Sequence, residues 1–351
     1  MTAKSKYESG TVRFKKDGKA YVKTKNSWKK CKQDFSDAEA VIKLYKANHR
    51  LNLLIDNNEP KWLKGFLTKN HEPRGARIKF LPNGKELDVA FSLFAENLRI
   101  HDQDSEDHWD VIFQNKGGTF AYCYTLEKKK WHAQQKYKKV WQFDKVYSCL
   151  FHKVEQALKD ETDYLAVPVY TLLKTYMRVG NEIYYKAHGH KGLTTLKNKD
   201  VQIKDDKVRF NYLGKDGVPI LVEHKFSKCY VERLRRLLKQ TKSSDFIFTA
   251  PGSKHPLSEQ HFKKAFRNYV GMEFYPHIVR SHYASKQVRD FLRDKKKVTK
   301  EEVNGLFLSI AHQLGHQRFV KKKQQWQDNA TVTVSHYVQP ELVEKVRARI
   351  V

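Results

Sequence analysis

Five short segments in the second half of the chain carry side chains suited to breaking a phosphodiester bond without a metal ion. That chemistry needs a nucleophile, permanent positive charge around the phosphorus and an acid for the departing oxygen. Arginine pairs with phosphate oxygens and stays charged, lysine or histidine can transfer the proton, and a tyrosine ester can be reversed. The segments are residues 177–182 with 191–198, then 212–217, 276–283, 311–316 and 335–338.

The charge of the whole chain is consistent with a phosphate-rich partner. The 351 residues include 68 Lys+Arg and 39 Asp+Glu, which gives a net charge of +29. Residues 1–150 carry 30 basic and 18 acidic side chains, and residues 151–351 carry 38 and 21, so the excess is not confined to a tail. A folded protein that is basic throughout is typical of nucleic-acid binding, because each neutralised phosphate releases a counterion. A basic housekeeping protein or a binder of anionic membranes is the alternative.

Composition also narrows the class and the compartment. Hydrophobic residues make up 40% of the chain and aromatic residues 13%, which indicates packed cores. No stretch approaches the ~20 apolar residues of a membrane span, and the first residues lack the apolar core of a signal peptide. We therefore expect an intracellular, DNA-associated protein that is neither secreted nor membrane-bound. The four cysteines have no CxxC spacing, so we expect reduced thiols and no metal site.

The pattern along the chain predicts an α+β fold with a mainly β N-terminal lobe and a mainly α catalytic lobe that contains a small β-sheet. Residues 1–58 form an N-terminal extension of unknown role, and residues 59–145 are β-rich, with hairpins expected near residues 82–84 and 115–118. Residues 146–351 are mostly helical, apart from short strands at 201–203, 208–213 and 219–222. Lys215 falls in the turn between the last two strands.

The order of the five segments identifies a family. The succession of Arg178, Lys215, His277-x-x-Arg280, Leu-Gly-His316 and Tyr337 resembles the catalytic domain shared by type IB DNA topoisomerases and tyrosine recombinases. The strings Arg-Val-Gly-Asn-Glu and Gly-Leu-Thr-Thr-Leu-Lys-Asn resemble the small poxvirus and bacterial type IB topoisomerases in particular. The resemblance covers residues 146–351 and extends more weakly over 115–145, which it marks as part of a DNA-binding domain.

The six candidate catalytic residues include His277, and the resemblance implies a role for each of the other five. Tyr337 would attack the phosphate to form a 3′-phosphotyrosyl link, while Arg178 and Arg280 hold the non-bridging oxygens. Lys215 would protonate the departing 5′ oxygen, and His316 would hydrogen-bond a non-bridging oxygen. The implied reaction uses no cofactor, metal or ATP. His312 is the competitor of His316, and Tyr283 that of Tyr337.

The resemblance also suggests DNA contacts outside the chemistry. Tyr122 and Tyr124 match a Tyr-x-Tyr of the family's DNA-binding domain, and a helix after the Arg178 motif approaches the major groove in the family. The predicted DNA-binding residues are Tyr122, Tyr124, Lys136, Lys138, Lys139, Tyr184, Tyr185 and Lys186. Core packing is the alternative for the tyrosines, and a solvated helix face for the lysines.

Two departures from the family pattern leave alternatives open. His277 makes a His-x-x-Arg that is typical of recombinases, and the 21 positions from His316 to Tyr337 include what we expect to be an inserted basic loop at 318–331. We expect a monomer that relaxes supercoiled duplex DNA. A site-specific tyrosine recombinase or integrase is the first alternative, although the short segment after Tyr337 offers little for exchange between protomers. A non-catalytic DNA-binding module is the second.

Overall fold

The chain folds into two compact units, residues Met1–Gln135 and Lys136–Val351. A computed structural model describes residues 7–101, 108–115 and 118–351. The combination of several small sheets with ten α-helices over these residues confirms the α+β class. Within the described ranges, no helix has the length and apolarity that crossing a membrane requires.

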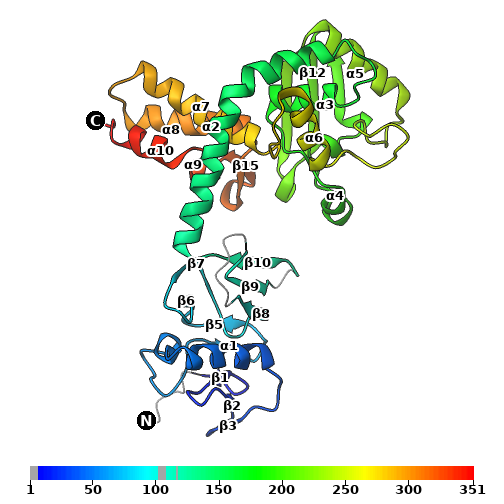
Figure 1. The fold of residues 1–351 in the computed structure, drawn as a ribbon. Coiled ribbons are helices and arrows are strands. Elements are labelled where there is room, and N and C mark those ends of the chain that lie inside the picture. The colour runs from blue at the N-terminus through cyan, green and yellow to red at the C-terminus, as the bar shows by residue number, and fades with distance from the viewer. Residues whose placement is uncertain (1–6, 102–107, 116–117) are drawn as a thin grey trace. The chain divides into compact units, whose positions relative to one another are not determined.

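The first unit is built mainly of short antiparallel strands (Figure 1). A five-stranded sheet has the order β3-β2-β1-β4-β5, a three-stranded sheet the order β10-β9-β8, and β6 pairs with β7. The strands are β1 (Val12–Phe14), β2 (Ala20–Lys23), β3 (Trp28–Lys30), β4 (Phe66–Leu67), β5 (Pro73–Arg74), β6 (Ile78–Phe80), β7 (Glu86–Phe91), β8 (Glu96–Ile100), β9 (Val111–Gln114) and β10 (Phe120–Cys123). The hairpins predicted near 82–84 and 115–118 correspond to the β6–β7 and β9–β10 pairs.

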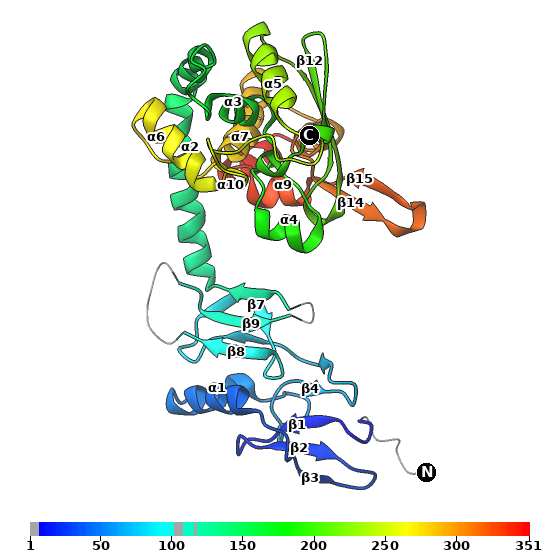
Figure 2. The same ribbon diagram turned by 90° about the vertical axis from the view of Figure 1, so that its right-hand side faces the viewer.

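One hydrophobic core runs through the whole first unit. The helix α1 (Ser36–Ala47) lies on one side of β1, β2 and β3 (Figures 1 and 2) and buries Val41, Ile42 and Tyr45. These side chains belong to the same buried cluster as Phe91 and Leu98 from later strands. Residues 1–58 therefore share a core with the β-rich segment that follows them.

The second unit is mainly helical. The long helix α2 (Leu126–Ala157) enters it at Lys136. The other helices are α3 (Ala166–Thr175), α4 (Glu182–His188), α5 (Lys228–Gln240), α6 (Glu259–Val270), α7 (Ile278–Asp294), α8 (Lys300–Gln313), α9 (Ala330–His336) and α10 (Pro340–Arg347). The three predicted strands form an antiparallel sheet of β11 (Val201–Lys204), β12 (Lys207–Leu213) and β13 (Pro219–Lys225).

The β12–β13 hairpin places Lys215 at its turn, as predicted. Alternate residues of β12, among them Phe210 and Tyr212, are buried in the core, so one face of the sheet is anchored. Leu213 pairs with Pro219, and a tight turn at Lys215–Gly217 connects them.

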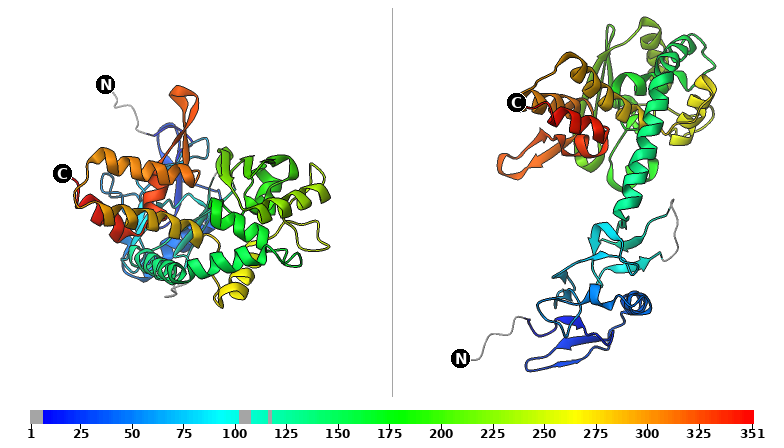
Figure 3. Two further views of the ribbon diagram at one scale, coloured as in Figure 1. Left: turned by 90° about the horizontal axis from the view of Figure 1, so that it is seen from above. Right: turned by 60° about the vertical axis from the view of Figure 1, so that its left-hand side comes forward.

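The segment expected to be a basic loop is instead largely a β-hairpin. The strands β14 (Gln317–Val320) and β15 (Gln325–Asp328) pair antiparallel, and Figures 2 and 3 show them pointing out from the rest of their unit. Phe319 and Trp326 lie opposite each other with ring centroids 5.5 Å apart. A cross-strand aromatic pair of this kind stabilises a hairpin, and the abundance of lysine in the segment concealed it.

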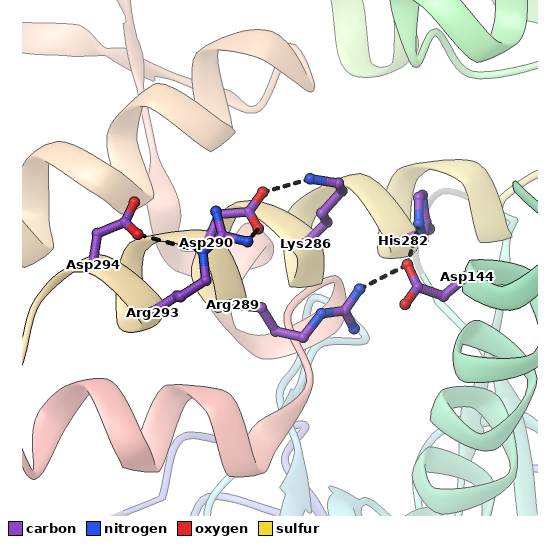
Figure 4. Close-up of polar contacts among 7 residues, drawn as sticks. All are labelled: Asp144, His282, Lys286, Arg289, Asp290, Arg293 and Asp294. Carbon is purple, nitrogen blue, oxygen red and sulfur yellow. Dashed lines mark hydrogen bonds and ion pairs between the residues drawn. The ribbon is translucent and has the colours of Figure 1, made fainter. Parts of the chain in front are cut away.

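Helix α7, which carries two candidate catalytic residues near its start, is fixed to α2 by a hydrogen bond and an ion pair to the same carboxylate (Figure 4). Asp144 of α2 accepts from His282 at 2.7 Å and from Arg289 at 2.8 Å. Further along α7, Asp290 pairs with Lys286 and Arg293. Because His282 is buried, the Asp144 contact defines how the start of α7 packs.

The segment that carries Arg178 packs closely against residues 192–194, and two glycines make this close backbone contact possible. The amide of Leu193 donates to the carbonyl of Arg178 at 2.7 Å, and the amide of Thr194 donates to that of Val179 at 2.7 Å. Gly180 has a φ of +94°. At Gly192, an added Cβ would lie 2.6 Å from both the Arg178 carbonyl oxygen and the Gly180 nitrogen. The two strings noted in the sequence are therefore two sides of one close backbone contact.

We expect Gly192→Ala to separate the two backbones and displace Arg178. Overpacking of this kind costs about 1–3 kcal/mol, measured as the free energy of unfolding in urea. Gly305→Ala is the matched control, because Gly305 lies inside α8 with nothing within 4 Å of an added Cβ. It should raise stability by up to ~1 kcal/mol through helix propensity. Equal effects of the two substitutions would contradict the close backbone contact.

Candidate active site

Five of the six predicted catalytic side chains meet in the second unit. Arg178 follows α3, His277 and Arg280 lie at the start of α7, His316 follows α8 and Tyr337 ends α9. The centre of the Tyr337 ring lies 4.8 Å from that of His316 and 5.5 Å from that of His277. The guanidinium carbons of Arg280 and Arg178 lie 5.1 and 6.0 Å from the same ring.

Arg280 is held in place by backbone carbonyls. Its Nη1 donates to the carbonyl of Tyr176 at 2.5 Å, and its Nη2 donates to the carbonyl of Leu314 at 2.8 Å and to Nε2 of His316 at 3.0 Å. Burial lowers the pKa of Arg280 to about 10, so the side chain stays charged at neutral pH. A buried cation bound by neutral acceptors can still bind an anion.

The contacts of His316 identify its tautomer. Arginine can only donate, so Nε2 of His316 must accept from Arg280, with Arg178 a further 3.4 Å contact. The proton then lies on Nδ1, which donates to Oγ1 of Thr333 at 2.7 Å. Burial, together with the charges of Arg280 and Arg178, lowers the pKa of His316 to about 3. His316 is therefore neutral in the structure.

The hydroxyl of Tyr337 already has a proton acceptor. It lies 2.8 Å from Nε2 of His277. Burial and the nearby arginines lower the pKa of His277, which keeps the imidazole neutral and able to accept. The side chain of Tyr337 is only 4% exposed. The nucleophile proposed from the sequence is thus enclosed, with its hydroxyl directed to a base.

A cavity of about 560 Å³ opens beside these residues. Arg178, Arg280, His316 and Lys215 line it, but Tyr337 is not among its lining residues. Lys215 is exposed at its hairpin turn, so its ammonium can move toward a bound group. In the described part of the chain, no three His, Cys, Asp or Glu residues are grouped to hold a metal ion.

Ile220 connects the Lys215 hairpin to the His316 turn. An added Cβ at Gly214 would lie 2.8 Å from its side chain, and one at Gly315 would lie 2.6 Å from it. Gly315 also has a φ of +64°. The glycine of the Leu-Gly-His motif is therefore required both for its backbone conformation and for this contact.

Sequence reasoning missed three side chains that position the site. Thr333 fixes the His316 ring, and its carbonyl accepts from the Tyr337 amide at 3.0 Å. The Tyr137 hydroxyl donates to the carbonyl of Val338 at 2.7 Å, and Oγ of Ser285 lies 3.4 Å from the carbonyl of Tyr337. The spacing of Thr333 four residues before Tyr337 was the one available signal, since it puts both on one helical turn.

Lys136, predicted to bind DNA, lies next to Tyr337. It donates to the carbonyl of His336, and its Nζ is 5.5 Å from the centre of the Tyr337 ring. Burial lowers the pKa of Lys136. Its ammonium adds a positive charge beside Tyr337, a position that charge patterning alone could not reveal.

The other predicted DNA-binding residues are spread over two units. In the first unit, Tyr122 is 49% exposed on β10, and Tyr124 is half-buried. On α2, Lys138 and Lys139 are exposed.

Helix α4 carries the last three. Tyr184 is exposed, Tyr185 packs against Phe246, and Lys186 pairs with Glu182 at 2.8 Å.

The two competitors noted in the sequence lie elsewhere. His312 is exposed and pairs with Asp328 at 2.9 Å. Tyr283 stacks on Tyr176 with ring centroids 4.1 Å apart, and burial raises its pKa to about 12. His316 and Tyr337, by contrast, are in contact with the arginines.

Comparison with known proteins assigns this catalytic unit to a family. Residues 126–345 match the model of the catalytic core of eukaryotic DNA topoisomerase I, which is well over half of the chain. The chain belongs to this topoisomerase family, and the resemblance to type IB enzymes is confirmed.

Poxvirus proteins are among its relatives. The DNA topoisomerase I of monkeypox virus and the DNA topoisomerase 1B of vaccinia virus (strain Copenhagen) are each 29% identical over 113 residues, 31% of this chain and 35% of theirs. The DNA topoisomerase 1 of rabbit fibroma virus is 28% identical over 123 residues, 34% of this chain and 37% of its own. The match thus spans about a third of the length of these relatives.

A solved structure of the XerH site-specific recombinase bound to difH substrate is also similar in part. It is 14% identical, with a TM-score of 0.32 over 48% of this chain and 44% of that one. That score is too low to establish a shared fold.

We expect stability to fall as the pH drops from about 6.5 toward 3, because His316 binds a proton more readily in the unfolded state. Its folded pKa of about 3 lies below the ordinary value, so the contribution is complete above the unfolded pKa and is lost on acidification. The slope from this one group is at most about 1.4 kcal/mol per pH unit. Urea unfolding at neutral and mildly acid pH measures it, and His316→Asn should flatten the dependence. An unchanged slope in that variant would contradict the assignment.

Proposed function

We propose that the chain is a type IB DNA topoisomerase that relaxes supercoiled duplex DNA by cutting and resealing one strand. The observation that carries the proposal is the convergence of Arg178, Arg280 and His316 on the ring of Tyr337. Two guanidinium groups beside the same tyrosine ring provide bidentate donors for a phosphate, and they stabilise the negative charge that develops on it during the reaction.

In the proposed cleavage step, Oη of Tyr337 attacks the phosphorus and its proton passes to Nε2 of His277. The P–O5′ bond breaks as the P–Oη bond forms, and Lys215 gives a proton to the departing 5′ oxygen. Arg178 and Arg280 bind the non-bridging oxygens throughout. Resealing is the reverse of these steps, so the phosphotyrosyl ester conserves the bond energy.

Phosphate binding must reorganise His316. Its Nε2 now accepts from Arg280, whereas hydrogen-bonding a phosphate oxygen requires a proton on that nitrogen. A phosphate that draws the arginines away frees Nε2, and the negative charge favours its protonation. Tyr337 is also enclosed, so the same adjustment of side chains gives the phosphate access to its hydroxyl.

We further propose that the chain acts as a monomer on duplex DNA inside the cell or viral particle.

The tyrosine recombinase alternative is favoured by one observation, the contact of His277 with Tyr337, because His-x-x-Arg is the recombinase form of the motif. Exchange of strands between two target sites would support it.

The first test is relaxation of a supercoiled plasmid in EDTA. The wild type should give a ladder of relaxed topoisomers, and Tyr337→Phe should give none, because the phenyl ring keeps the packing but lacks the nucleophile. A covalent protein–DNA adduct should be trapped by detergent only with the wild type. Failure of the wild type to relax the plasmid, or relaxation by the phenylalanine variant, would refute the proposal.

A second test removes the hydroxyl that fixes His316. Thr333→Val should lower the single-turnover cleavage rate at least about tenfold and cost about 1–3 kcal/mol of stability, since it leaves a buried N–H without an acceptor. Thr171→Val is the matched control, because Thr171 is equally buried and hydrogen-bonded but lies in α3. It should lower stability without the same loss of rate. Similar rate losses in both variants would reduce Thr333 to a packing role.

A further inference from the structure

One face of the β1–β2–β3 sheet in the first unit is built of lysines and aromatic rings. Directly opposite residues share a face, and the register pairs Tyr21 with Lys30 and Lys23 with Trp28. Lys15, the residue directly after β1, forms an antiparallel β-bridge with Trp62. We call this face the platform; it consists of Lys15, Tyr21, Lys23, Trp28, Lys30 and Trp62. The opposite face, with Val12, Phe14, Ala20 and Val22, packs into the core.

The rings of the platform form a connected, partly exposed layer. The ring centroids of Trp28 and Trp62 are 4.4 Å apart, and those of Tyr21 and Trp62 are 6.2 Å apart. Beneath them Arg13 is fully buried, with its guanidinium 5.1 Å from the Trp62 ring and 2.7 Å from Asp56. This buried charge, matched by an acid, fixes the tryptophan from below.

Lysine ammonium groups lie over two of these rings. Nζ of Lys15 is 4.0 Å from the centre of Tyr21, and Nζ of Lys23 is 5.9 Å from the centre of Trp28. The surrounding segment, residues 11–32, carries nine basic side chains and one acidic one. A cation on an exposed ring is held weakly, so a stronger ring partner can displace it.

We propose that the platform binds a single strand of nucleic acid, with bases stacked on Tyr21, Trp28 and Trp62 and phosphates on the lysines. Stacking on aromatic side chains together with a basic surface is how proteins hold unpaired strands. A base that stacks on a ring displaces the ammonium, which then neutralises a neighbouring phosphate. A duplex cannot use the rings, because its bases stack on each other. This binding site lies outside the catalytic unit and is independent of the proposed cleavage.

The aromatic part of the proposal is tested by fluorescence anisotropy on the full chain. The probes are labelled oligothymidylate and oligouridylate of about 20 nucleotides, long enough to exceed one binding site, and a duplex of equal length. Trp28→Ala should weaken binding of the single strands about 5- to 100-fold and affect the duplex much less. Trp28→Phe, which keeps a ring, should retain most of the affinity. The two single strands distinguish DNA from RNA as the source of the ligand.

The charged part is tested by salt dependence. Replacing Lys15, Lys23 and Lys30 with Gln removes three phosphate contacts, so the slope of log affinity against log salt for oligothymidylate should become shallower by about 2. The control replaces Lys43, Lys79 and Lys85 of the same unit, which are exposed and lie outside the platform, with the same change in charge. It should alter the slope less.

Three results would overturn the proposal. If Trp28→Ala weakens duplex and single-strand binding equally, the platform is a general phosphate surface. If Trp28→Ala and Trp28→Phe weaken single-strand binding equally, the effect is a folding defect. If the two lysine triples give the same salt slope, the platform lysines do not contact the phosphates.

Discussion

Two positively charged guanidinium groups share one imidazole nitrogen, and much of the catalytic unit serves to hold them there. Arg178 and Arg280 repel each other, and the hydrogen-bond acceptors of Arg280 are backbone carbonyls and the neutral His316 rather than carboxylates. A neutral partner stabilises a cation only modestly, so an approaching phosphate meets charge that no protein anion has already neutralised. Preorganised charge at the point where negative charge develops is the largest single contribution that many enzymes make to catalysis.

Several distant contacts maintain this arrangement. The backbone contact between Gly180 and Gly192 fixes the segment of Arg178, and Asp144 fixes the helix of Arg280. Ile220 lies against both glycine turns of the cavity wall. None of these residues needs to touch DNA, yet each determines where a cation lies. Misplacement of a reacting group by even about 1 Å can cost two orders of magnitude in rate, which explains why packing outside the cavity matters so much.

The sequence allowed the fold class, the sheet of the catalytic unit and the grouping of its candidate residues to be predicted, because these depend on periodicity and on ordered motifs. It did not reveal what depends on three-dimensional packing. The lysine-rich composition of 318–331 concealed a hairpin whose stability comes from the pairing of Phe319 with Trp326. Lys136 was predicted only as one of several lysines that contact DNA, whereas it lies beside Tyr337. Thr333 carries no motif, since its importance arises only from its contact with His316.

The β14–β15 hairpin makes the chain between His316 and Thr333 longer without moving the two residues apart. The amide of Asn329 donates to the carbonyl of His316 at 2.8 Å, which closes the hairpin at its base. The residues between these two form a loop whose ends are held together, and the entropic cost of closing a loop grows only slowly with its length. Extra residues in the hairpin can therefore lengthen the interval between His316 and Tyr337 without separating the two side chains. The tip of the hairpin, Lys321–Lys323, is accordingly a place where a fluorophore or a small reporter domain can be attached without separating His316 from Thr333.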